Sequence, residues 1–234
     1  MRKIVVTLSE RVAPLTFASP VAYVYNPLDY ARDPYLEYCH RYGTGRKKAV
    51  FLGMNPGPWG MAQTGIPFGD VTMVTEWLGI EGHVEPPAEV HPKRPVNGFQ
   101  CKRGEVSGRR LWGWAKSRYG QPEHFFKRFW VANYCPLVFM EKSGRNRTPD
   151  RLKMNEKRSL FEACDEALYR MAELIQPEFV IGIGHFAHGR AEKALADLHL
   201  RVGRISHPSP ANPKANRGWA ELIEGELADI GISL

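Results

Sequence analysis

The sequence lacks the cysteine spacing of a metal or iron–sulfur site. Its four cysteines are Cys39, Cys101, Cys135 and Cys164. They form no CxxC pair, which excludes the zinc-ribbon pattern and favours reduced thiols in an intracellular protein. His185 and His188 have no third ligand at a suitable spacing. We therefore expect neither a metal nor a cofactor.

Long hydrophobic runs are also missing. No stretch approaches the roughly 18 consecutive apolar residues expected of a membrane-spanning segment. The first residues, MRKIVVTLSERVAP, contain only a short apolar run before polar residues, which is too little for a secretory signal peptide. We therefore expect no membrane partner and an intracellular location, in the cytoplasm, nucleoid or nucleus.

The composition is that of a globular protein with one core. The chain has 234 residues, of which 43% are hydrophobic. This is enough for one well-filled core and too short to demand two, so we expect a single domain over residues 1–234. We also expect a monomer. Lysine and arginine together number 32 against 25 acidic residues, and this charge of +7 favours a polyanionic partner.

Four short apolar or β-branched runs are typical of buried strands. They span Lys48–Gly53, Phe129–Ala132, Glu178–Ile183 and Arg201–Ser206. The segments between them carry helical patterns. Strands separated by helices predict an α/β fold, a single-domain α/β/α sandwich with a central four-stranded parallel sheet.

Apolar residues at alternating spacings of three and four mark one helical face before Pro177. They are Phe161, Cys164, Leu168, Met171 and Ile175. Thr148 followed by Pro149 predicts an N-cap with proline at the first helical position. Further amphipathic stretches run over 187–198 and from Trp219 to the carboxyl end. The stretch Glu81–Arg110, rich in proline, glycine and basic residues, is predicted to be a surface excursion.

Polar side chains follow three of the predicted strands directly. Asn55, Asn133 and His207 stand in the segments MNPGPWGMAQTGIPFGD, NYCPL and HPSPANPKAN. Loops at the carboxyl ends of parallel strands converge on one crevice. Any one of these residues alone is more simply explained as tying down a turn. Three that converge beside glycine- and proline-rich loops favour a ligand site.

The same segments resemble a known family. GMNPGPWGMAQTGIPFGDV, NYCPLVFM followed by SGRNRTP, and HPSPANPKANRGW are similar to the motifs of the single-strand-selective monofunctional uracil-DNA glycosylases, within the uracil-DNA glycosylase superfamily. The match covers nearly the whole chain, from about Tyr30. It implies a DNA-repair enzyme that flips uracil out of DNA and hydrolyses its N-glycosidic bond without a metal, and it admits oxidised pyrimidines such as 5-hydroxymethyluracil.

Two residues are the expected catalytic groups. The resemblance assigns Asn55 to positioning the attacking water, and an amide can orient water but has no useful basicity. His207 is expected to donate a hydrogen bond to uracil O2, where negative charge accumulates as the base departs.

Four residues are expected to bind the base. The Asn133 amide can pair with uracil N3–H and O4, whereas cytosine presents the opposite pattern at those atoms. Phe68 matches the stacking aromatic of the family, against the alternative of plain core packing. Met54 and Gly57 are expected to shape the pocket.

DNA is the expected partner, both single- and double-stranded. The first predicted DNA-binding set is Ser143, Gly144, Arg145, Asn146 and Arg147, which supplies backbone and guanidinium donors to phosphates.

A second predicted DNA-binding set is Pro208, Ser209, Pro210 and Lys214, in a segment that runs to Trp219 and resembles the wedge that fills the gap left by a flipped base. Many relatives carry arginine where this chain has Ala211. That difference bears on activity toward duplex relative to single strands.

Two other classes of protein remain as alternatives. One is a DNA-lesion binder that keeps the pocket but has lost turnover, and the other is an α/β enzyme acting on free nucleosides. The segment GIGHFA, from Gly182 to Ala187, fits a dinucleotide-binding pattern, but the strand after it ends without the acidic residue that would hold a ribose.

Overall fold

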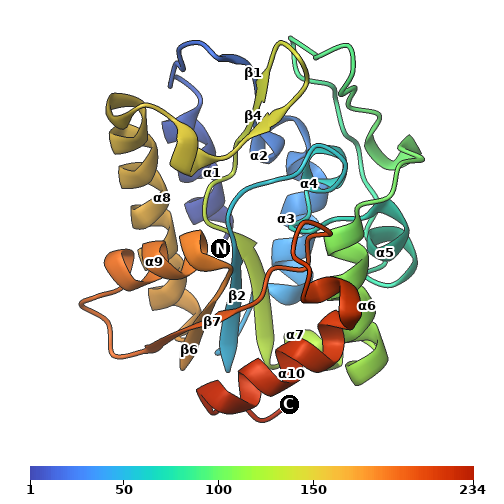
Figure 1. Cartoon of the computed structure of the whole chain (residues 1–234), viewed down its shortest axis with the longest axis vertical. Helices are drawn as coiled ribbons and strands as arrows, with labels where there is room; N and C mark the ends of the chain where they lie inside the picture. Colours follow the sequence, from blue (N-terminus) through green and yellow to red (C-terminus); the bar gives the residue numbers. More distant parts are fainter.

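The computed structural model describes all residues from 1 to 234, and a parallel sheet lies at its centre. Its strands are β2 (Ala49–Gly53), β3 (Phe129–Asn133), β6 (Phe179–Ile183) and β7 (Arg201–Ile205). They pair in the order β3-β2-β6-β7, all parallel, which confirms the predicted four-stranded sheet (Figure 1). Strands β2 and β6 are buried along their whole length, as expected for strands covered on both faces.

Helices cover both faces of this sheet (Figure 1). On one side lie α1 (Arg2–Val12), α8 (Met154–Ile175) and α9 (His185–Ala194). On the other lie α6 (Val106–Tyr119), α7 (Pro122–Phe126) and α10 (Trp219–Ile230). The remaining short helices are α2 (Pro27–Tyr30), α3 (Arg32–Tyr42), α4 (Met61–Thr64) and α5 (Val71–Glu76). No helix combines the length and the apolar character needed to cross a bilayer.

Aromatic packing fixes the strand that ends in Asn133. The Tyr38 ring stacks on Trp130 with centroids 4.4 Å apart, and its hydroxyl donates to the Val131 carbonyl at 3.0 Å. Both rings are fully buried, so each removes a large apolar area from water. The buried core therefore fixes the position of β3, which ends in Asn133.

A second, antiparallel sheet was not predicted from the sequence. It contains β1 (Val21–Tyr25), β4 (Val138–Glu141) and β5 (Asn146–Arg147), in the order β1-β4-β5. The β4–β5 hairpin turns through Gly144, whose φ of 84° is unfavourable for residues with a side chain. Because β4 begins shortly after Asn133, this hairpin places the SGRNRTP segment beside the carboxyl ends of the parallel strands.

The predicted helix start at Thr148 and Pro149 is wrong for the long helix. Pro149 begins a single 3₁₀ turn, Pro149–Arg151, and the Thr148 side chain makes no capping hydrogen bond. Helix α8 begins later, at Met154, where the Glu156 carboxylate accepts a hydrogen bond from the Lys153 backbone N–H at 3.0 Å. A proline at the first position suits a 3₁₀ turn as well as an α-helix. The Thr148–Pro149 pattern therefore does not distinguish between the two.

The excursion Glu81–Arg110 is only partly a surface segment. His91 and Val96 are 2% and 5% exposed, and the first turn of α6 lies inside the segment. Its backbone runs back over the parallel sheet's carboxyl edge, since the Asn97 N–H donates to Gln63 Oε1 at 2.8 Å. The proline and glycine content was informative about irregular backbone but not about burial.

Candidate active site

A cavity of about 270 Å³ opens at the carboxyl ends of the parallel strands. It brings together all six residues predicted to act on the base: Met54, Asn55, Gly57, Phe68, Asn133 and His207. They come from the last residue of β3 and from the segments that follow β2 and β7, as the topology of a parallel sheet requires. The side chains that line the cavity are mostly polar, which suits a heterocycle with several hydrogen-bonding atoms.

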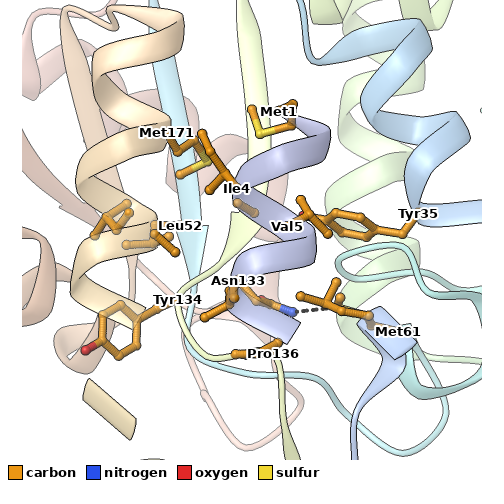
Figure 2. Close-up of a pocket in the computed structure, with 15 residues that line it drawn as sticks. Met1, Ile4, Val5, Tyr35, Leu52, Met61, Asn133, Tyr134, Pro136 and Met171 are labelled. Carbon is orange, nitrogen blue, oxygen red and sulfur yellow. Dashed lines mark hydrogen bonds between the residues drawn. The ribbon is translucent and has the colours of Figure 1, made fainter. Parts of the chain in front are cut away.

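A second void lies behind this cavity and is apolar. It measures about 40 Å³ and is lined mostly by hydrophobic side chains from α1, α8 and neighbouring segments (Figure 2). Asn133 stands between the two, and its amide nitrogen points at Met61 Sδ, 3.3 Å away (Figure 2). The void is too small for a base and offers little polar lining, so it is a gap in core packing.

The Asn55 side chain is fixed in one orientation. Its Nδ2 donates to the Leu137 carbonyl at 3.0 Å, and its Oδ1 accepts no hydrogen bond from the protein. The two loops are joined along their backbones as well, because Cys135 N–H donates to the Met54 carbonyl at 2.9 Å. An oriented amide with a free acceptor can hold a water molecule.

Phe68 is held in an uncommon backbone conformation. Its φ is 54°, a left-handed value that costs a non-glycine residue free energy. Its carbonyl accepts hydrogen bonds from Trp112 Nε1 at 3.1 Å and from the Asp70 N–H at 2.9 Å. Helix α6 approaches this carbonyl at Gly108, where an added Cβ would lie 1.9 Å from the oxygen. These contacts fix the ring at the wall of the cavity, 6.1 Å from the His207 ring between centroids.

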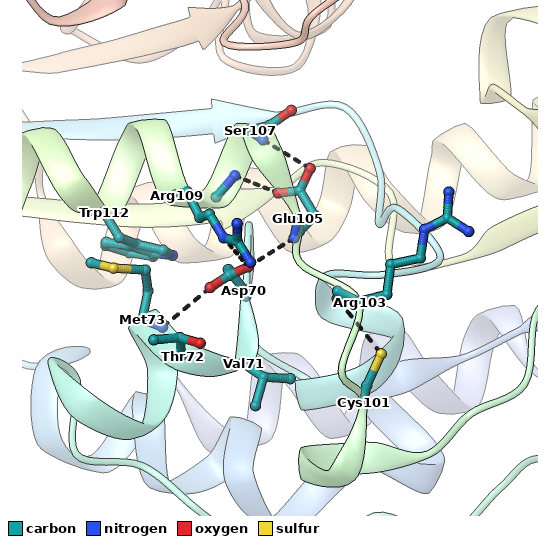
Figure 3. A network of polar contacts seen from close by, with 12 residues as sticks. Asp70, Val71, Thr72, Met73, Cys101, Arg103, Glu105, Ser107, Arg109 and Trp112 are labelled. Atoms are coloured by element: carbon teal, nitrogen blue, oxygen red, sulfur yellow. Dashed lines mark hydrogen bonds and ion pairs between the residues drawn. The ribbon is translucent and has the colours of Figure 1, made fainter.

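A polar network behind Phe68 holds this backbone in place (Figure 3). Asp70 is 1% exposed, and its carboxylate accepts from the Glu105 N–H at 2.8 Å and from Arg109 Nε at 3.0 Å. It also caps α5 by accepting from the Met73 N–H. One buried carboxylate therefore joins the loop of Phe68 to the starts of two helices.

His207 is a neutral imidazole with a defined tautomer. Burial lowers its pKa from 6.5 to about 4, because the charged form loses its hydration. The Ser209 N–H donates to Nδ1 at 3.0 Å, so Nδ1 is the acceptor and the ring proton lies on Nε2. The Asn212 side chain donates to the His207 carbonyl at 3.0 Å and fixes the backbone. The ring can thus present one N–H donor to a ligand.

Among the lining residues that the sequence reasoning missed are Glu105 and Ser107, at the start of α6. Glu105 supplies the one carboxylate of the lining and accepts hydrogen bonds from the N–H groups of Ser107 and Gly108 at the start of α6. Burial raises the pKa of Glu105, against the lowering effect of those hydrogen bonds. The segment GEVSG, with an acidic residue ahead of an amphipathic helix, carried a signal of a helix cap but not of a cavity wall.

The first predicted DNA-binding set is only partly brought to the cavity. Asn146 lines it, whereas Ser143, Gly144 and Arg145 lie in the hairpin turn outside. The Arg147 guanidinium pairs with Glu141 at 3.0 Å and also donates to the Arg151 carbonyl. Its donors are thus largely used within the protein, while Arg145 is exposed and has no such partner.

The second set lies on the loop that follows β7. Ser209 lines the cavity, and Pro210 and Lys214 are exposed beyond it. Pro208 is buried, and its carbonyl accepts from Arg110 Nη1 at 2.8 Å. The side chain of Pro208 therefore shapes the loop instead of presenting itself to a partner.

The chain contains no cluster of three or more His, Cys, Asp or Glu side chains placed to hold a metal ion. His188 Nδ1 lies 3.3 Å from Glu192 Oε2 on its own helix, and the His185 ring contacts the Arg204 guanidinium.

Comparison with known proteins places this chain in one class. Residues 40–223 match the family model described as the Uracil DNA glycosylase superfamily. The crystal structure of wild-type Pedobacter heparinus SMUG2 superposes with a TM-score of 0.69, covering 97% of this chain and 97% of that one at 19% sequence identity, which supports the fold.

Relatives of higher identity define the family more narrowly. The single-strand selective monofunctional uracil-DNA glycosylase of Rattus norvegicus is 46% identical over 96% of this chain and 82% of its own length. The proteins of the same name from Mus musculus and Bos taurus are each 45% identical over 96% of this chain, covering 81% and 84% of their own lengths. This chain therefore belongs to the single-strand-selective monofunctional uracil-DNA glycosylase family, and the resemblance found in its motifs is confirmed.

Proposed function

We propose that this chain removes uracil from DNA by hydrolysing the N-glycosidic bond, which leaves an abasic site and an intact strand. The observation that carries the proposal is the meeting of Asn55, Asn133 and His207 around one cavity. The names of the mammalian relatives agree with it. An enzyme with this substrate works inside the cell, where its DNA is, and we expect it to act as a monomer.

The aromatic ring and the amide that line the cavity explain how the base is recognised. Uracil stacks on the Phe68 ring, and the Asn133 amide pairs with N3–H and O4. Met54 and Gly57 complete the wall beside the base. Because the base must leave the helix stack to enter, single-stranded DNA is the easier substrate, and duplex DNA must also meet the flipping cost of a few kcal/mol.

Bond cleavage is led by departure of the base. The Nε2–H of neutral His207 donates to uracil O2, where negative charge develops. A neutral donor suits this role, since it stabilises the anion without having to give up its proton. Asn55 Oδ1 orients the water, but an amide cannot act as a strong base, so water adds late to a sugar that already carries positive charge. The Glu105 carboxylate supplies negative potential to the same cavity.

Three further parts of the proposal concern breadth and DNA contact. The enzyme also accepts oxidised uracils such as 5-hydroxymethyluracil. Arg145 in the hairpin turn and Lys214 on the loop after β7 contact phosphates, and Ser143 and Asn146 add polar contacts beside Arg145, whereas Gly144 is buried and its N–H and carbonyl are bonded within the protein. Ser209 and Pro210, with the segment that runs to Trp219, enter the gap in duplex DNA.

The test is excision from a single-stranded oligonucleotide that carries labelled uracil, in EDTA, followed by alkali. Free uracil with strand breaks that require alkali supports the proposal. Binding without release would mean a lesion binder, and release from deoxyuridine but not from DNA would mean a nucleoside enzyme. Asn55→Ala and His207→Ala should each lower the single-turnover rate by about 10²–10³. His40→Ala is the matched control, because His40 is exposed on α3.

A further inference from the structure

Trp59 differs from every other tryptophan of the chain. The other five are buried, with exposures between 0% and 7%: Trp77, Trp112, Trp114, Trp130 and Trp219. Trp59 is partly exposed and lies between Gly57 and Gly60, both of which line the cavity. A large aromatic side chain is thus kept at the surface beside the mouth of the site.

Two arginines pack on this indole. The guanidinium carbon of Arg103 lies 4.5 Å from the ring centroid, and that of Arg94 lies 5.3 Å from it. Both distances are within the range of cation–π attraction. Two cations beside one ring repel each other, and the indole offsets only part of that repulsion.

Neither arginine has an acidic partner. Arg94 donates to the carbonyls of Gly144 and Lys93, and the Arg103 guanidinium takes part in no ion pair. Figure 3 shows the Arg103 side chain pointing away from the Asp70 and Glu105 carboxylates. The two positive charges are therefore oriented by the indole and left uncompensated, which favours an anionic ligand.

The cluster is braced to the cavity by Gln63, which is fully buried. Its Nε2 donates to the carbonyls of Pro58 at 2.8 Å and Pro95 at 2.9 Å. One amide thus joins the loop that carries Trp59 to the segment that carries Arg94. Any ligand held by the two arginines has a fixed position relative to the cavity.

We propose that Arg94, Trp59 and Arg103 form a phosphate clamp for the DNA strand that carries the flipped nucleotide. The two guanidinium groups bind backbone phosphates next to the target, and the indole is a positioning residue that holds them apart. The clamp rests on the proposed function in one respect, since it assumes that DNA is the substrate. It binds backbone and not base, so it acts equally on damaged and undamaged strands.

The experiment measures affinity for an undamaged single-stranded oligonucleotide over a range of salt concentrations. Each lost phosphate contact lowers the slope of log affinity against log salt by about 0.7 for single strands. Arg94→Gln with Arg103→Gln should therefore lower the slope by about 1.4. The charge-matched control is Lys116→Gln with Lys127→Gln, because both lysines are exposed and Lys127 lies just before β3, at the opposite edge of the sheet.

Two further readouts separate a clamp from a general loss of structure. Trp59→Ala should weaken binding and Trp59→Phe should restore it, while the single-turnover rate at saturating uracil-DNA stays unchanged. Undamaged single-stranded DNA should also reduce acrylamide quenching of the wild-type fluorescence, since Trp59 is the tryptophan that solvent reaches. A slope equal to that of the lysine control, or quenching unchanged by DNA, would overturn the clamp and leave uracil excision untouched. Failure of the wild-type protein to release uracil would overturn the proposed function without altering the binding measurements.

Discussion

The Oδ1 atom of Asn133 lies so close to Gly53 that a Cβ added to this glycine would be only 2.3 Å away. The two residues are paired in register at the ends of β3 and β2. The same Cβ would lie 2.8 Å from Cε2 of Phe68. Gly53 therefore lets the proposed pairing amide and the proposed stacking ring occupy one cavity.

Gly53→Ala should displace both side chains. Because a shift of about 1 Å in a reacting geometry can cost about 10² in rate, we expect a loss of that size in single-turnover uracil excision. Gly113→Ala is the control, since a Cβ there meets no atom within 4 Å and alanine suits a helix interior. Thermal unfolding of both variants shows whether the fold is kept. A fully active Gly53→Ala protein would mean that Asn133 and Phe68 do not hold the base.

His207 should titrate far below an ordinary histidine. Its pKa of about 4 predicts that the ring is neutral throughout pH 5 to 8, so His207 gives the activity profile no step near pH 6.5. NMR of the ring protons against pH measures this midpoint directly. A midpoint near 6.5 would remove the argument for a neutral donor.

The same shift makes stability depend on pH in a known direction. Between pH 6.5 and about 4 the unfolded chain binds a proton at His207 that the folded protein does not, so stability falls as the pH is lowered through this window. At pH 5 this protonation lowers the free energy of unfolding by at most about 2 kcal/mol relative to neutral pH. Denaturant midpoints at pH 7 and pH 5 should differ less for His207→Gln than for the wild type. Equal differences would contradict the buried neutral state.

Asn133→Asp should weaken uracil excision. A carboxylate cannot donate to O4, and it repels the uracil anion as that anion forms. The Met61 sulfur, now the contact of Asn133 Nδ2, would also lose its donor. Single-turnover rates on uracil-DNA measure the effect, with Asn97→Asp at an exposed position as the control. Undiminished excision would mean that base selection lies elsewhere.

Glu105→Gln tests the one carboxylate in the lining of the cavity. We expect about a tenfold lower rate at neutral pH, about 1.4 kcal/mol, because negative potential is lost where the sugar becomes positive. The raised pKa of Glu105 means that the wild-type rate should fall as the pH drops through that pKa, whereas the variant should lack this step. Glu166→Gln, exposed on α8, is the control. A purely structural role for Glu105 would change stability and leave the pH profile as it was.

The sequence predicted the fold and the site best where one physical rule determines both the position of a strand and the position of the residue that follows it. Buried parallel strands need apolar runs, and their carboxyl ends meet at one edge, so Asn55, Asn133 and His207 could be placed together before any coordinates. Glu105 could not, because it reaches the cavity through helix α6 packing on the Phe68 carbonyl, a contact between distant segments. Strands β1, β4 and β5 were missed for a related reason, since β1 pairs with β4 across more than a hundred residues and β5 has only two residues, too few to show a period.

The buried Gln63 amide has a consequence for how the enzyme meets a lesion. Its side chain joins two loops through three hydrogen bonds, to Pro58, Pro95 and Asn97. The conformational entropy of these loops is therefore lost during folding. Ordering them costs no further entropy when DNA binds. We therefore expect the cost of rearrangement to fall mainly on the incoming nucleotide, so weakly stacked or mispaired uracils should be captured first.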